Sequence, residues 1–161
     1  GPQLVPLKDK FILSFLNKKN YANLGIYKYD YYNNKWKFLD NQLDEKSITA
    51  RIKSGGVFAI LKDTKSPTIS RMVPKIGSTY RNDHFEMLKF DVKDDLSGIK
   101  NEKNIEVLLD GEKIICEYNT YRNTVFYNLK DPLIKGKHKI EISVSDNSDN
   151  TKKISGVFYI K

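Results

Sequence analysis

The sequence has one cysteine, two histidines and four arginines among 161 residues, and each shortage excludes a class of protein. A single cysteine, Cys116, rules out an internal disulfide framework. No carboxylate pair, nucleophile triad or metal cluster has a recognisable spacing, so we expect no enzyme activity in this chain. No apolar run approaches the roughly 20 residues that a transmembrane helix needs.

The start of the chain also lacks a basic segment followed by an apolar one, so no signal peptide is predicted. A leading Gly1-Pro2 is typical of a cleaved purification tag, and we therefore expect an excised fragment of a larger protein. Hydrophobic residues make up 39% and charged residues 30% of the chain, as in a folded globular protein. We expect Cys116 to be a small buried hydrophobe on a strand.

The positive charge is unevenly distributed along the chain. Residues 1–65 contain 12 Lys and Arg against 6 Asp and Glu, a net charge of +6, whereas residues 66–161 contain 16 against 14, a net charge of +2. Lysine supplies most of this charge, and it attracts polyanions without the planar donor fork of arginine. The first part is therefore where a polyanion-binding surface is expected, with a merely solvated lysine-rich surface as the alternative.

Short runs that alternate with a period of two fill the chain, and no sustained helical period occurs, so the sequence predicts an all-β protein. Residues 1–64 are predicted to form a small antiparallel β-domain. Asn33-Asn34 predicts a type I′ hairpin turn, because asparagine tolerates positive φ. The strands expected here are residues 11–16, 24–32, 35–39, 47–52 and 57–61.

A linker is predicted at residues 63–67, since Pro67 favours extended geometry before it and no apolar period continues through the segment. Residues 65–161 then show about seven strands at the spacing of a β-sandwich. Asp110-Gly111 is the strongest hairpin signal in the chain. The strands expected are residues 68–72, 85–93, 105–109, 112–118, 124–129, 138–146 and 152–160.

Two corners rich in Asp follow strands of this second part, where Asp and Asn side chains accept hydrogen bonds from nearby backbone amides. The order of its motifs is similar to that of a bacterial immunoglobulin-like family. The motifs are Ser66-Pro67-Thr68-Ile69, Asp94-Asp95-Leu96-Ser97-Gly98-Ile99, Leu109-Asp110-Gly111, Gly136-Lys137-His138 and Asp146 to Asn150. The resemblance implies an immunoglobulin/fibronectin-type-III-like β-sandwich. Asp149 stands where the family has glycine, so it has to tolerate the turn geometry.

The first part resembles the β-domain that often precedes this sandwich in bacterial extracytoplasmic proteins. The motifs, in order, are Leu24-Gly25-Ile26-Tyr27, Trp36-Lys37-Phe38-Leu39, Gly56-Val57-Phe58-Ala59-Ile60 and Asp63-Thr64-Lys65-Ser66-Pro67. The resemblance implies the C-terminal accessory region of a secreted or envelope protein, some of which carry a lysostaphin-type zinc peptidase domain. That enzyme needs a His-x-x-x-Asp and a His-x-His pair. Neither His84 nor His138 begins such a pair, so we expect any peptidase upstream of this chain.

Asp94, Asp95, Asp146 and Asp149 are candidate calcium ligands. Ca²⁺ takes about six to eight oxygen ligands, and these carboxylates supply several if the two corners meet in space. Capping of the corners explains the same residues without a metal, and no EF-hand spacing is present. No other metal and no cofactor is predicted.

Aromatic residues and lysines are interleaved between residues 21 and 38. Aromatic faces stack on sugar rings or bases, and lysines attract a polyanion. The alternative is that Tyr and Trp, as good strand formers, fill a small core. Alternation sends Tyr27, Tyr29 and Tyr31 to one face of a strand. The candidate binding face is Tyr27, Tyr29, Tyr31, Lys28, Lys35 and Trp36.

The leading functional hypothesis is a non-catalytic structural and targeting module that positions a neighbouring domain of a bacterial extracytoplasmic protein near the cell envelope. Its rival is a direct binding module whose Tyr/Lys face engages glycan, peptidoglycan or a host polyanion. The expected partners are thus the neighbouring domain and cell-wall glycan or another protein. Neither a specific nucleic acid nor a transmembrane segment is expected.

Overall fold

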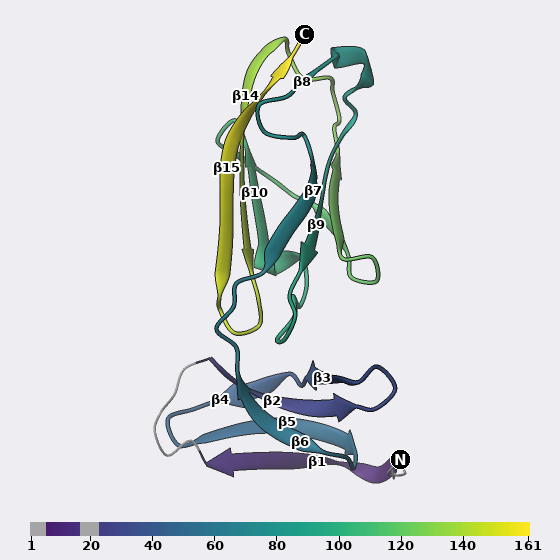
Figure 1. Ribbon diagram of the computed structural model, residues 1–161, viewed down its shortest axis with the longest axis vertical. Coiled ribbons are helices and arrows are strands. Elements are labelled where there is room, and N and C mark those ends of the chain that lie inside the picture. Colours follow the sequence, from purple (N-terminus) through teal and green to yellow (C-terminus); the bar gives the residue numbers. More distant parts are fainter. Residues whose placement is uncertain (1–5, 17–22) are drawn as a thin grey trace. The chain divides into compact units, whose positions relative to one another are not determined.

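The computed structural model of the chain describes residues 6–16 and 23–161. The chain divides into two compact units, residues 1–65 and 66–161, both built of strands (Figure 1). In the described part of the chain, the only helical elements are two 3₁₀ turns of three residues each, η1 (Asn82–His84) and η2 (Glu102–Asn104). The all-β prediction is therefore confirmed. No helix among these residues is long and apolar enough to cross a membrane.

Unit 1 contains two three-stranded antiparallel sheets, with strand orders β1-β5-β4 and β3-β2-β6. The strand β4 was not expected from the sequence, because three residues are too few to show a period. The strands are β1 (Pro6–Leu16), β2 (Leu24–Asp30), β3 (Lys35–Phe38), β4 (Asn41–Leu43), β5 (Ser47–Ser54) and β6 (Phe58–Lys62).

The core of unit 1 forms where the two sheets turn their apolar faces toward each other. Ile26 of β2 packs with Ile48 and Ala50 of β5, and all three are buried. This follows from the alternation of β5, which places every second side chain on one face of the strand. Partly buried side chains complete this cluster: Leu13, Phe15, Leu24, Leu39, Phe58 and Ile60.

The turn between β2 and β3 is wider than the sequence predicts. A two-residue type I′ turn at Asn33-Asn34 needs positive φ at both residues, but only Asn34 has it, with φ 51°. Residues 31–34 all belong to the turn, and β3 begins at Lys35. The Asp30 carboxylate accepts hydrogen bonds from the backbone amides of Tyr32 (3.0 Å) and Asn33 (3.2 Å). These bonds stabilise the wider loop. The prediction of a two-residue type I′ turn at Asn33-Asn34 was wrong.

Unit 2 is a sandwich of a five-stranded sheet, β11-β10-β14-β15-β8, and a four-stranded sheet, β12-β13-β9-β7. In the described part of unit 2, the strands pair in antiparallel fashion except β8 and β15, which are parallel. The strands are β7 (Thr68–Val73), β8 (Thr79–Tyr80), β9 (Met87–Lys93), β10 (Ile105–Leu109), β11 (Glu112–Ile114), β12 (Glu117–Asn119), β13 (Thr124–Asn128), β14 (Gly136–Ser145) and β15 (Thr151–Ile160).

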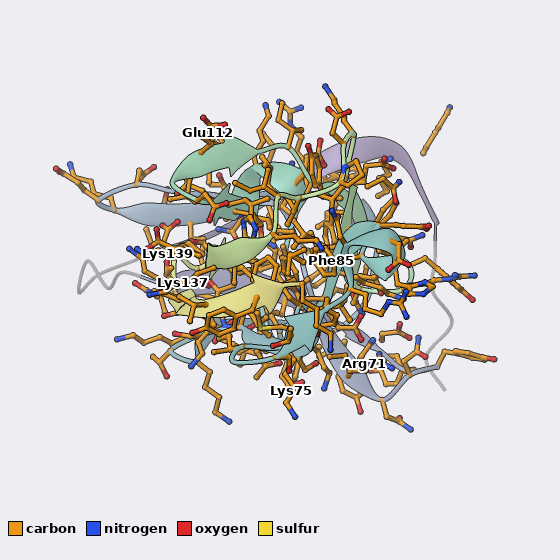
Figure 2. The ribbon with its side chains drawn as sticks, turned by 90° about the horizontal axis from the view of Figure 1, so that it is seen from above. Arg71, Lys75, Phe85, Glu112, Lys137 and Lys139 are labelled. Carbon is orange, nitrogen blue, oxygen red and sulfur yellow. The ribbon has the colours of Figure 1, made fainter. Side chains whose placement is uncertain are left out.

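Strand β14 shows how sequence alternation builds the sandwich core. Ile140, Ile142 and Val144 are buried, as their spacing predicts, whereas Lys137 and Lys139 are exposed on the opposite face (both are labelled in Figure 2). The buried cluster draws on both sheets and comprises Phe85, Leu88, Phe90, Val92, Val107, Leu109, Val125, Ile140, Ile142, Val144, Phe158 and Ile160.

The hairpin predicted at Asp110-Gly111 is present, with φ 53° and 87° at these two residues, as a type I′ turn requires. The single strand predicted over residues 112–118 is wrong. It breaks at Ile115 and Cys116, so that β11 pairs with β10 in one sheet and β12 with β13 in the other. Cys116 lies at this crossover, half-buried, instead of on a strand.

Candidate functional site

A groove of about 780 Å³ lies in unit 1 between the ends of β2, β3 and β5. Its walls combine aromatic rings from the β2–β3 turn with basic side chains from all three strands. We call it the Tyr/Lys groove. The lining residues are Lys28, Tyr29, Asp30, Tyr31, Tyr32, Lys37, Leu39, Arg51, Ile52, Lys53 and Ser54.

Three of the six residues of the predicted binding face line this groove, namely Lys28, Tyr29 and Tyr31. Lys35 and Trp36 are on the neighbouring strand β3 and do not line it. Tyr27 does not belong to an exposed binding face as the sequence predicted, because its side chain is 0% exposed. A Cβ on Gly25 would lie 2.7 Å from Cε2 of Tyr27, so the Tyr27 ring covers this glycine and cannot serve as a surface contact.

The aromatic residues of the groove support one another. The Tyr29 ring meets Tyr31 edge to face at 4.9 Å between centroids, and it meets Trp36 in the same way at 5.1 Å. Edge-to-face pairs at such distances are attractive beyond the area they bury. Tyr31 and Tyr32 extend outward, with exposed fractions of 40% and 94%. Tyr31 therefore leans on a packed aromatic pair, and the exposed rings of Tyr31 and Tyr32 are both open to a ligand.

The basic residues of the groove include a like-charged pair. Lys28 of β2 is directly opposite Lys37 of β3 in the antiparallel register. Like charges in this position destabilise a sheet, since their Cβ atoms are only about 5 Å apart. The Lys28 ammonium donates a hydrogen bond to Ser54 Oγ at 2.5 Å and lies 5.9 Å from the centroid of the Phe58 ring. This lysine is thereby held at a defined position in the groove.

Sequence reasoning missed the two basic residues that β5 contributes, Arg51 and Lys53. Both are exposed, at positions that alternate with Ala50 and Ile52. That alternation is visible in the sequence and shows that the two cations share a face. It cannot show that Arg51 and Lys53 line one groove with Tyr29 of β2, because that groove joins segments about 20 residues apart in the sequence.

Among the described residues, Asp30 is the one carboxylate that lines the groove. Hydrogen bonds from the Asn33 side chain and backbone lower its pKa, with further contributions from the Tyr32 amide and the charge of Lys35. Both of its oxygens accept these bonds, Oδ1 from the backbone and Oδ2 from Asn33 Nδ2 at 2.8 Å. Asp30 therefore shapes the turn, and its single negative charge beside four cations leaves the groove with a net positive charge.

In unit 2, the two Asp corners meet as the calcium hypothesis requires. The Asn147 amide donates to the carbonyl of Gly98 at 2.9 Å, and its side chain donates to the carbonyls of Ser97 and Gly98. Carboxylate oxygens of Asp94 and Asp146 lie within 4.8 Å of each other.

Each of these carboxylates caps its own corner. Asp94 Oδ2 accepts from the amides of Leu96 (3.0 Å) and Gly98 (2.7 Å). Asp146 Oδ1 accepts from the amides of Ser148 (2.7 Å) and Asn150 (2.9 Å).

The other two candidate calcium ligands do not join that pair. Asp95 forms an ion pair with Lys93 at 2.6 Å, and this contact raises the pKa of Lys93. Asp149 is exposed and holds the corner open with φ 63°, as its position in the motif demands. Capping hydrogen bonds account for Asp94 and Asp146 in the structure, an ion pair accounts for Asp95, and calcium binding stays a prediction.

His138 links two of the sequence motifs of unit 2. It is 4% exposed, its Nδ1 lies 2.7 Å from Asp110 Oδ2, and its Nε2 lies 2.8 Å from the carbonyl oxygen of Ile134. Burial lowers the pKa of His138, but the hydrogen bonds to Ile134 and Asp110 together with the Asp110 charge outweigh it and raise the pKa overall. The ring also stacks on Phe158 at 5.4 Å.

Two further reactive side chains of unit 2 are His84 and Cys116. His84 ends η1 with its side chain 70% exposed, 3.8 Å from the carboxylate of Asp83. Burial raises the pKa of the Cys116 thiol to about 11, so the thiolate that a nucleophile requires is disfavoured. No protein-family model and no curated protein matches the chain.

Proposed function

We propose that the chain is a non-catalytic binding module of a larger bacterial extracytoplasmic protein, and that the Tyr/Lys groove of unit 1 binds a polymer of the cell envelope. The observation that carries the proposal is the pairing of two outward tyrosines, Tyr31 and Tyr32, with four basic side chains around one groove. Its volume of about 780 Å³ is in the range of ligand sites, about 300–1,000 Å³.

Unit 2 is proposed to be an immunoglobulin-like spacer that positions a neighbouring domain, such as the peptidase of a lysostaphin-type enzyme. What supports this is its strand order. The sheet β7-β9-β13-β12 corresponds to strands A, B, E and D of an immunoglobulin domain, and β10-β14-β15 corresponds to C, F and G. Asp94 and Asp146 cap corners, and Asp110 ties the β10–β11 turn to β14, which are contacts expected of a structural scaffold.

Binding to purified bacterial cell wall tests the proposal. The intact chain is expected to cosediment with the wall, and the double variant Tyr31→Ala/Tyr32→Ala is expected to bind about tenfold more weakly, a difference of about 1.4 kcal/mol. Tyr31→Phe/Tyr32→Phe keeps both rings and should retain binding. Tyr121→Ala removes a tyrosine from unit 2 that is also 94% exposed, and it should bind like the parent chain.

Circular dichroism of each variant establishes that unit 1 stays folded. Equal retention of the parent and the Tyr31→Ala/Tyr32→Ala chain would overturn the groove as the binding site. If the intact chain is not retained at all, the structural and targeting role becomes the better account of the module.

A further inference from the structure

We propose that the ligand of the Tyr/Lys groove is an anionic glycan, a chain of sugar rings that carries sulfate, phosphate or carboxylate groups. This inference rests on the proposed function, since it names the chemistry of the polymer that the groove binds. Three features of the groove lead to it: an excess of cations, a fixed ammonium group, and exposed tyrosine rings beside them.

The cations of the groove are not neutralised by the protein. The four are Lys28, Lys37, Arg51 and Lys53. In the part of the chain that the structure describes, no Asp or Glu forms an ion pair with any of them. The two carboxylate oxygens of Asp30 already accept hydrogen bonds from the turn amides and from the Asn33 side chain. A bound anionic group would relieve the repulsion between Lys28 and Lys37, which the sheet register otherwise leaves in place.

The Lys28 ammonium is the part of the groove best prepared for an anion. The hydrogen bond to Ser54 uses one of its three donors and fixes its place, which leaves donors for a ligand. Holding a flexible lysine in advance lowers the side-chain entropy that binding would otherwise cost. Lys37, Arg51 and Lys53 are exposed around it and add attraction without further ordering.

The tyrosines supply the second half of the recognition. Tyr31 and Tyr32 offer amphipathic rings, on which the C–H faces of a sugar pack while the hydroxyl groups remain hydrated. The contact of Tyr31 with Tyr29, which itself packs on Trp36, restricts the motion of the first ring. Charge and ring stacking then act on one ligand only if it carries both anionic groups and rings.

A glycan fits the groove better than a nucleic acid does. Arg51 is the only guanidinium among the four cations, whereas phosphate recognition in nucleic-acid sites favours the planar, bidentate fork of arginine. Lysines act as compact point charges, so they accept anionic groups of varied geometry.

Dextran sulfate and unsulfated dextran are matched probes, because they share a backbone and differ in charge. Titrations of the intact chain at low and moderate salt should give a Kd for dextran sulfate at least about tenfold below that for dextran. The variant Lys37→Gln/Arg51→Gln/Lys53→Gln should weaken dextran sulfate binding by about tenfold or more. As a control of equal charge, Lys75→Gln/Lys137→Gln/Lys152→Gln removes three exposed lysines from unit 2 and should not weaken it (Lys75 and Lys137 are labelled in Figure 2).

Each outcome separates the two proposals. Equal affinity for both dextrans, lost in Tyr31→Ala/Tyr32→Ala, would overturn the anionic ligand but support a binding groove. The same loss in the unit 2 control would show that net charge alone acts, and would overturn the inference. Tighter binding of single-stranded oligo(dT) than of dextran sulfate would overturn it in favour of nucleic acid. Binding that is indifferent to both tyrosines and cations of the groove would sink the proposed function itself.

Discussion

The charged form of a buried imidazole is favoured when both of its nitrogens face hydrogen-bond acceptors, and His138 meets this condition. The carbonyl of Ile134 can only accept a hydrogen bond, so Nε2 has to donate to it. The carboxylate of Asp110 likewise accepts from Nδ1. Asp110 also accepts from the Lys139 amide at 2.7 Å, so one carboxylate ties the β10–β11 turn to β14.

The stability of unit 2 should consequently depend on pH. Because the folded-state pKa of His138 is raised above the value of 6.5 for a free imidazole, its contribution is complete below pH 6.5. The contribution is lost as the pH rises through the folded-state pKa. The free energy of unfolding, measured by denaturant titration between pH 5.5 and 8.5, should fall over this window.

Asp110→Asn is the matching variant, since asparagine keeps the turn geometry and removes the charge. We expect it to destabilise unit 2 by about 1–3 kcal/mol at pH 5.5 and to reduce the pH dependence. His84→Gln, which removes an exposed imidazole, controls for the loss of a histidine. A pH dependence that survives unchanged in Asp110→Asn would contradict this account.

Among the elements, the corner after β14 carries a backbone conformation that its sequence does not favour. Asp149 has φ 63°, and adopting the left-handed conformation costs an L-residue about 1–2 kcal/mol. Its side chain is exposed, whereas the capping bonds of the corner come from Asp146. Asp149→Gly should therefore stabilise unit 2 by about 1 kcal/mol, measured as a higher denaturation midpoint.

Gly98 in the facing corner is the opposite case. Its φ is 77°, and an added Cβ would meet only Asn147 Nδ2, at 3.9 Å. Gly98→Ala should therefore destabilise by about 1 kcal/mol through the backbone alone. If Asp149→Gly instead lowers the denaturation midpoint, the Asp149 side chain stabilises the corner by more than its positive φ costs.

Strands with a clear period were predictable from the sequence, and elements defined by their neighbours were not. The alternation in β14 sets its buried face, and Asp110-Gly111 sets its turn, since both depend on local chemistry. Ile114, Cys116 and Tyr118 recur at every second position, yet the chain crosses there from one sheet to the other. The pairing of the two-residue strand β8 with β15 likewise depends on a partner some 80 residues away, which no local pattern reveals.

The same limit applies to the groove. A period of two correctly groups Tyr29 with Tyr31, but it also assigns Tyr27 to their face, where packing over Gly25 and against Phe38 buries it. Alternation tells which side of a strand a residue occupies, and only the packed structure tells what covers that side.

At the scale of the whole chain, the two units have separate cores of unequal size. In the described residues, the buried cluster of unit 1 consists of Ile26, Ile48 and Ala50, whereas that of unit 2 has twelve members. A unit of about 65 residues buries a smaller fraction of its surface on folding and is correspondingly less stable. We therefore expect unit 1 to unfold first.

Calorimetry of the intact chain should then show two transitions, the lower one from unit 1. Ile48→Ala should lower only the first, since truncation of a buried isoleucine costs about 2–5 kcal/mol, and Val107→Ala should lower only the second. Dextran sulfate at about 100 times its Kd should stabilise unit 1 by about 2.7 kcal/mol and raise the first transition alone. A shift of the second transition instead would place the ligand on the sandwich, because a ligand stabilises only the unit whose folded state it binds.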